Sequence, residues 1–250
     1  NIISKRTSIT IELLVSYLED SFYKYEFKKQ KDTSKIRLCN LVSNKIIPNK
    51  VFIKNISYGK AIANGIKLAK DLGNTPPNIC NPTFLSKEAT KLKKINNKLK
   101  ITILDEQKMK TLGMGSLLSV SQGSKQPAKL VTIEYMPLKN KQPIVLVGKG
   151  ITFDTGGISL KPSPNMDEMK FDMSGAGSVL GTMSALAEMN IKKNVVGVIA
   201  CAENMPGSQA SRPGDVVTSM SGITIEILNT DAVSYTHLRA HETGRTLVCR

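Results

Sequence analysis

The apolar residues of this chain follow two patterns, short continuous runs and runs that return every three to four positions. Continuous runs predict buried strands, and runs with helical spacing predict helices that pack one face against a sheet. Their alternation favours an α/β domain, with a mostly parallel or mixed sheet flanked by helices. The expected strands are 100–104, 129–136, 143–148, 195–201 and 224–228, and the expected helices are 57–73, 86–97 and 173–189. Ser57 is expected to cap the first of these helices and Gly73 to stop it.

Shifts in composition divide the chain into four segments. Residues 1–50 mix apolar and lysine-rich stretches, and we expect them to be the end of a smaller α/β N-terminal domain. A linking helix is expected over 51–75, before a proline-rich break, and the main domain over 76–232. Residues 233–250 do not continue the pattern and resemble translated adapter sequence, so we expect them to be foreign to the protein.

Composition limits the class of protein. With 40% hydrophobic residues the chain can bury a sizeable core, which excludes a disordered polar chain. The longest strongly apolar run, 195–202, is too short to span a bilayer, and no signal region opens the sequence. Four scattered cysteines without a C-x-x-C pair suit a reducing compartment. We therefore expect a soluble, cytoplasmic protein without a membrane partner.

The net charge of +15 raises the alternative of a nucleic-acid-binding protein. Most of this charge comes from lysines interleaved with Asn and Ile, as in 91–100, and no aromatic residues interleave a basic stripe. We therefore favour a solvated basic surface and keep DNA binding as a weaker interpretation. A phosphate or nucleotide site over 148–157 is a third interpretation, although Phe153 breaks the glycine fingerprint. The glycines at 175–181 favour close helix packing over a nucleotide site.

Carboxylates and lysines are the chemistry that remains. Both histidines lie in the segment expected to be foreign, which excludes histidine-based catalysis and histidine-rich zinc sites elsewhere. Lys149 and Asp154 follow a buried strand, at the edge where α/β folds place their sites. Lys161 lies in the next loop, Asp172 precedes a long helix, and Asp231 follows a later strand.

Three converging carboxylates suit Mn²⁺, Mg²⁺ or Zn²⁺, and a shared carboxylate can bridge two ions. Each residue alone also has a structural explanation: Asp172 as a helix cap, the lysines as surface charges and Asp231 in a turn. Their joint placement at strand ends favours a site, but spacing alone does not name the reaction.

Four long stretches carry a more specific signal: 147–172, 202–207 (Ala-Glu-Asn-Met-Pro-Gly), 212–215 (Arg-Pro-Gly-Asp) and 229–232 (Asn-Thr-Asp-Ala). In these stretches the chain closely resembles the leucyl (cytosol) aminopeptidase family of dinuclear metallopeptidases. The resemblance implies two divalent ions, Mn²⁺ or Zn²⁺. It implies that Lys149, Asp154 and Asp172 hold the tighter ion, and that Asp154 bridges to a second ion, which Asp231 also ligates. Lys161 would be the catalytic lysine, and 76–232 the first half of the catalytic domain.

The implied reaction is the release of N-terminal amino acids, with a leucine-type preference, from peptides that have a free N-terminus. A hydroxide activated by the two ions would attack the peptide carbonyl. Met169 and Asp172 would contact the substrate, with Met169 lining the pocket for its first side chain. The resemblance also implies a homohexamer and a bicarbonate held by an arginine. Some relatives of this family bind DNA, so that interpretation is compatible with the enzyme.

The end of the sequence departs from the family. Val233 and Tyr235 stand where the family has the bridging glutamate and the bicarbonate-binding arginine, and the similar residues 242–245 come nine positions too late. The rest of the catalytic domain and most of the N-terminal domain are also missing from the sequence. We therefore expect a fragment that binds metal poorly and has little or no peptidase activity, and an active intact protein.

Overall fold

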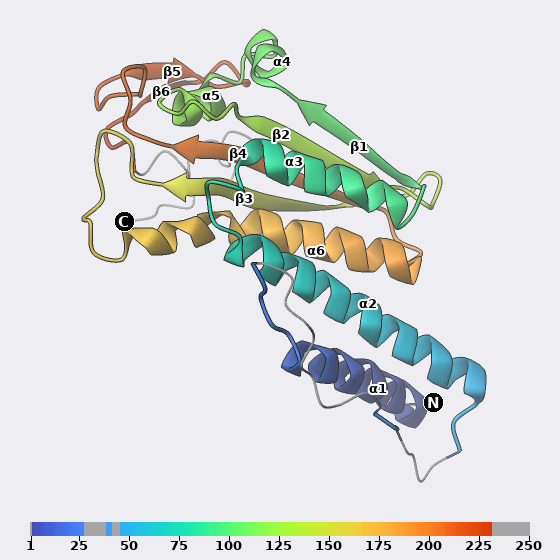
Figure 1. Cartoon of the computed structure of the whole chain (residues 1–250). Helices are drawn as coiled ribbons and strands as arrows, with labels where there is room; N and C mark the ends of the chain where they lie inside the picture. The colour runs from blue at the N-terminus through green and yellow to red at the C-terminus, as the bar shows by residue number, and fades with distance from the viewer. Residues whose placement is uncertain (1, 28–38, 42–45, 232–250) are drawn as a thin grey trace.

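The structure, a computed structural model, describes residues 2–27, 39–41 and 46–231, with side chains from residue 10 onward. Figure 1 shows a sheet with helices on both faces and a pair of helices that extends away from it. The expected α/β class, with helices that flank a sheet, is confirmed. Within the described ranges no helix is both long enough and apolar enough to cross a membrane.

The main sheet has four strands in the order β1-β2-β4-β3. β1 (Leu99–Leu104) runs antiparallel to β2 (Lys129–Tyr135), and β2 runs antiparallel to β4 (Val195–Asn204). β3 (Ile144–Asp154) runs parallel to β4 and is joined to it through a helix. The sheet is therefore mixed, which is one of the two forms that the sequence predicts, and only the β3–β4 pair of it is parallel. Continuous apolar runs report burial on both faces, and burial does not depend on strand direction.

The predicted strands are found, with different ends. β3 continues beyond residue 148 to Asp154, and β4 continues beyond residue 201 to Asn204. The last predicted strand, 224–228, lies outside the main sheet. Its counterpart β6 (Thr224–Glu226) pairs with β5 (Val216–Thr218) in a separate two-stranded antiparallel sheet.

Helix α2 (Asn49–Asn74) begins after Pro48, eight residues before the start predicted from apolar spacing and two residues before the linking helix expected over 51–75. Ser57 lies inside this helix, so its expected role as a cap is wrong. The first turns of α2 bury Asn55 and no apolar side chain, which is why the sequence shows no apolar period there. Gly73 is the penultimate residue of the helix, close to the predicted stop.

Helix α3 (Pro82–Lys91) also begins earlier than the predicted residue 86. Asn81 caps it by accepting a hydrogen bond from the Phe84 amide at 2.9 Å, and proline is tolerated in the first turn. A 3₁₀ turn, η1 (Leu92–Lys94), follows. Helix α1 was not anticipated and packs along α2 (Figure 1). The remaining helices are α1 (Ile2–Ser21), α4 (Glu106–Thr111), α5 (Gly115–Ser121), the 3₁₀ helix η2 (Met166–Met173) and α6 (Ser174–Met189).

Two hydrophobic clusters lie on opposite faces of the sheet. The larger one joins Leu85 of α3, Ile133 of β2 and Leu180 of α6, all fully buried. The smaller one joins Met109 of α4 to Ile151 of β3. Burial of such side chains is the main source of stability in the fold.

β3 is an edge strand with a partly uncovered face. Val145 and Val147 lie on the same face of β3 as Ile151, because side chains alternate along a strand. They are 55% and 56% exposed, whereas Ile151 is fully buried. The amino-terminal half of β3 therefore presents apolar side chains to solvent.

Close contacts at glycine fix α6 between α2 and β3. A Cβ on Gly181 would lie 2.3 Å from the Gly65 carbonyl oxygen, so α2 and α6 cross with their backbones in contact. A Cβ on Gly148 would lie 2.6 Å from the Gly175 carbonyl oxygen, so α6 also begins directly against β3. These contacts place η2, which immediately precedes α6, beside the end of β3.

Candidate functional site at the end of β3

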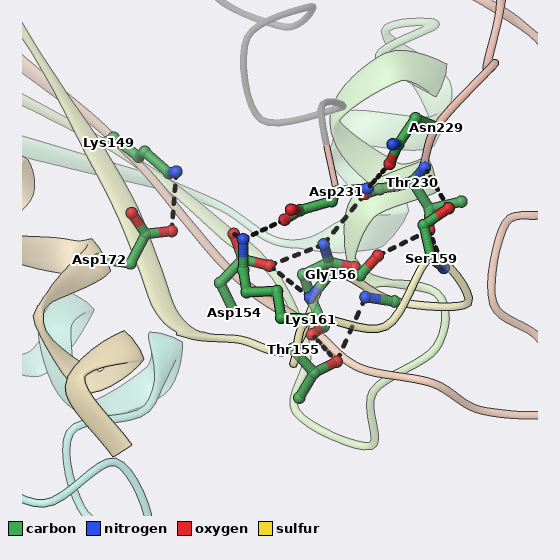
Figure 2. Close-up of polar contacts among 12 residues, drawn as sticks. Lys149, Asp154, Thr155, Gly156, Ser159, Lys161, Asp172, Asn229, Thr230 and Asp231 are labelled. Atoms are coloured by element: carbon green, nitrogen blue, oxygen red, sulfur yellow. Dashed lines mark hydrogen bonds and ion pairs between the residues drawn. The ribbon is translucent and has the colours of Figure 1, made fainter. Parts of the chain in front are cut away.

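The structure brings together the five charged residues that the sequence predicts as site residues (Figure 2). Lys149 Nζ lies 2.7 Å from Asp172 Oδ2, which joins β3 to η2. Lys161, in the loop after β3, lies between two carboxylates: its Nζ is 3.9 Å from Asp154 Oδ2 and is hydrogen-bonded to Asp231 Oδ1. Residues up to 82 positions apart in sequence therefore meet at one end of one strand.

A glycine turn shapes the backbone after Asp154. The β3–β4 register shifts between Ile151 and Asp154, and the next turn has positive φ at Gly156 (86°) and Gly157 (68°). This left-handed region is open to glycine and strained for other residues. The Gly156 amide donates to Asp154 Oδ1 at 2.9 Å, so the turn also orients the carboxylate.

A second set of hydrogen bonds ties the Lys161 loop to the segment that carries Asp231. The Ser159 amide donates to Thr230 Oγ1 at 2.8 Å, and the Thr230 amide donates to Ser159 Oγ at 3.1 Å. Thr230 Oγ1 also donates to the Gly156 carbonyl oxygen at 2.6 Å. Thr230 is 3% exposed, so these bonds are shielded from water and hold Asp231 close to Lys161.

Asn204, at the end of β4, completes this network. Its Nδ2 donates to Asp154 Oδ1 at 2.9 Å and to the Thr230 carbonyl oxygen at 3.2 Å. Ser159, Asn204 and Thr230 were not predicted as site residues from the sequence. Asn204 and Thr230 lie in two of the stretches that carry the family resemblance, and that was the one available signal.

Burial and neighbouring charges shift the pKa values of two groups at the site, Asp172 and Lys161. Burial raises the pKa of Asp172 to about 6, with a further contribution from the charge of Asp154 and an opposing one from the Lys149 ammonium. Burial would lower the pKa of Lys161, but the hydrogen bond to Asp231 and the charges of Asp154, Asp231 and Asp172 outweigh it and raise that pKa. Lys161 is therefore held in its protonated form.

The side chains at this site provide part of the ligand set that a hard divalent cation requires. Asp172 Oδ2 is buried and lies 2.7 Å from Lys149 Nζ, so the two side chains place an oxygen and a nitrogen donor next to each other. Among the described residues, His, Cys, Asp and Glu side chains alone form no cluster of three that could hold a metal. A cation here would need lysine nitrogen as well as carboxylate oxygen, and a ligating lysine must be neutral.

Met169, in η2, is half-buried, and its expected contact with substrate stays a prediction. A groove of about 650 Å³ is lined by Phe153 and Glu203, the residues just before Asp154 and Asn204, and none of the five charged site residues lines it. Val233 and Tyr235, together with both histidines, lie outside the described residues.

Several of the glycines considered for a phosphate site serve packing, whereas Gly156 and Gly157 form the turn that orients Asp154. Gly148 and Gly150 lie within β3 and not in a loop. A Cβ on Gly175 would lie 2.9 Å from the Lys149 backbone nitrogen, so the start of α6 needs glycine to approach the strand. This supports the packing interpretation over a nucleotide-binding loop.

Comparison with known proteins gives a consistent result. Residues 67–234 match the family described as "Cytosol aminopeptidase family, catalytic domain". A probable cytosol aminopeptidase of Thioalkalivibrio sulfidiphilus is 54% identical over 228 residues, which are 89% of this chain and 46% of that protein. The cytosol aminopeptidase of Pseudomonas aeruginosa is 53% identical over 223 residues, 88% of this chain and 45% of that protein. The chain thus spans about half the length of the curated relatives it matches.

A solved structure is also similar. The bottromycin maturation enzyme BotP, in a structure described as a complex with Mn, superposes with a TM-score of 0.81 at 30% sequence identity. The match covers 95% of this chain and 50% of that one.

Proposed function

Because the chain belongs to the cytosol aminopeptidase family, we propose that it forms the first half of the catalytic domain of a metal-dependent aminopeptidase. Residues 1–50 would end an N-terminal domain, 51–75 would link the two, and 76–232 would carry the chemistry. The observation that carries the proposal is the convergence of three aspartates and two lysines at the end of β3, inside the matched region.

Each charged residue has a distinct role in the proposal. Lys149, Asp154 and Asp172 would hold the tighter of two divalent cations, and Asp154 and Asp231 would hold the second. Bound there, the cations would act as Lewis acids that polarise the scissile carbonyl and lower the pKa of water. Manganese is supported by the complex of BotP with Mn, and zinc is the other candidate.

Lys161 would act on the substrate itself. The surrounding carboxylates keep its pKa raised, so it is protonated at neutral pH and can donate a hydrogen bond. A preorganised donor of this kind stabilises the negative charge that develops on the carbonyl oxygen, and its loss typically lowers the rate by about 10²–10³.

The substrates would be peptides with a free N-terminus and a leucine-type first residue, cleaved in the cytoplasm by a homohexamer. The 250-residue chain itself would bind metal weakly and hydrolyse little. Val233 and Tyr235 stand at the positions where the resemblance expects a glutamate ligand and an arginine for bicarbonate. Bicarbonate is therefore not part of the proposal for this chain.

The test is a chimaera in which residues 232–250 are replaced by the corresponding C-terminal segment of the Pseudomonas aeruginosa relative. We expect Mn²⁺-stimulated release of leucine from a chromogenic leucyl amide, and its loss in Lys149→Ala and in Asp154→Ala. Lys193→Ala, an exposed lysine before β4, is the matched control and should keep full activity. Full activity in Lys149→Ala or Asp154→Ala would overturn the assignment.

A further inference from the structure

Asn204 is the buried amide that bridges the two segments of the site. It lies directly opposite Asp154 in the β3–β4 register and is 5% exposed. A buried amide costs free energy unless its donors are satisfied, and both hydrogen bonds of this one go to the site segments, to Asp154 Oδ1 and to the Thr230 carbonyl oxygen.

These contacts divide the two oxygens of Asp154 between different tasks. Oδ1 accepts hydrogen bonds from the Gly156 amide and from Asn204 Nδ2, both at 2.9 Å. Oδ2 lies 3.9 Å from Lys161 Nζ, on the side of the other site residues. Because two donors hold one oxygen, the carboxylate cannot rotate without breaking a buried hydrogen bond, and Oδ2 keeps its direction.

The second donor contact extends this control to Asp231. Thr230 precedes Asp231, and its amide and hydroxyl are bound to Ser159 and Gly156. Asn204 therefore connects the strand end that carries Asp154 to the segment that carries Asp231. The Asn204 carbonyl oxygen also accepts from the Thr155 amide at 3.0 Å and the Thr155 hydroxyl at 2.9 Å, which fixes the start of the glycine turn.

We propose that Asn204 is a positioning residue that aims Asp154 Oδ2 into the site and sets the separation between Asp154 and Asp231. This positioning role rests on the proposed function, since both aspartates are proposed ligands of the same pair of cations. Residues that orient ligands in this way typically change metal affinity about 10–100-fold when they are removed.

The experiment compares Asn204→Ala with Asn194→Ala in the 250-residue chain. Asn194 is a matched control: it is 3% exposed, precedes β4 at its other end, and donates to the Leu138 and Lys141 carbonyl oxygens, both at 2.7 Å. The first readout, without metal, is hydrogen exchange of the Gly156 amide by NMR. The second is Mn²⁺ affinity, followed by the electron paramagnetic resonance signal of the free ion.

We expect Asn204→Ala to accelerate Gly156 exchange at least about tenfold and to weaken Mn²⁺ binding about 10–100-fold. Asn194→Ala should lower thermal stability to a similar extent and leave both readouts unchanged. The proposal is overturned if Gly156 exchange is unchanged in Asn204→Ala, or if both variants accelerate it equally.

The two proposals can fail separately. Accelerated Gly156 exchange in Asn204→Ala, with no Mn²⁺ binding by the wild-type chain, supports the positioning role and contradicts the metal site. If Asn204→Ala does not fold, the test is made on the wild-type chain, by NMR of the Asn204 side-chain amide protons. Slow exchange of these protons and a nuclear Overhauser contact to the Gly156 amide support the role, and rapid exchange without that contact overturns it.

Discussion

Gly181→Ala tests a close backbone contact in the fold, the crossing of α2 and α6. The added Cβ would lie 2.3 Å from the Gly65 carbonyl oxygen and 3.1 Å from its carbonyl carbon. Both atoms belong to backbone inside a helix, so the contact is relieved only if the two helices separate by about 1 Å. Overpacking of this kind costs about 1–3 kcal/mol, and alanine regains about 0.5–1 kcal/mol of helix propensity. We expect a net loss of about 1–2 kcal/mol.

Gly177→Ala, four residues earlier in α6, is the matched control. A Cβ there has its nearest neighbour at 3.5 Å, the Ala69 carbonyl oxygen, which is an ordinary contact. No steric clash then opposes the higher helix propensity of alanine, so this variant should be more stable than the wild type by about 0.5–1 kcal/mol. Urea denaturation followed by circular dichroism measures both. A Gly181→Ala protein as stable as the wild type, or equal destabilisation by the two substitutions, would refute the reasoning.

Three further outcomes are expected. In the metal-free chain, protonation of Asp172 stabilises the native state fully below pH 4 and less as pH rises through about 6, because its pKa is raised from the ordinary 3.8. In urea titrations, the free energy of unfolding of the wild-type chain should fall by up to about 3 kcal/mol between pH 4 and 7.5, and Asp172→Asn should abolish this fall. An unchanged pH dependence in the variant would contradict this. Leu180→Ala, at a fully buried position, should cost about 2–5 kcal/mol in the same assay, and a loss below 1 kcal/mol would mean that α6 is not packed on the sheet as described. Val147→Lys should lower self-association in sedimentation velocity without loss of stability, because it places a charge at an exposed apolar position on an edge strand. Unchanged self-association would show that the β3 edge does not form contacts between copies of the chain.

The sequence predicted the strands better than the helix starts. The segment 129–136 marks β2 almost to the residue, because its apolar residues Val131, Ile133 and Tyr135 alternate as the buried face of a strand does. Apolar spacing places the start of α2 too late, because the first turns of this helix bury no apolar side chain. The sequence does not predict the direction of β2, because pairing partners lie far away in sequence, as Leu130 and Ala200 do.

The same distinction applies to the site. Lys149 and Asp154 were predicted because they follow a strand, and strand ends are where α/β sites form. Asn204 and Ser159 were not, because their roles depend on partners 50 and 71 residues away. An asparagine at a strand end looks the same in a sequence whether it orients a carboxylate, as Asn204 does, or ties down a loop, as Asn194 does.

The central claim is that the side chains at the end of β3 form a metal centre. Its most direct test is addition of substoichiometric Mn²⁺ to the isotope-labelled chain, with paramagnetic broadening of the amide signals as the readout, which detects weak binding. We expect the amide signals of Lys149, Asp154 and Asp172 to broaden first, and Asp154→Asn to abolish the broadening. Broadening that begins elsewhere, for example at Asp20 and Asp71, or that persists unchanged in Asp154→Asn, would contradict it.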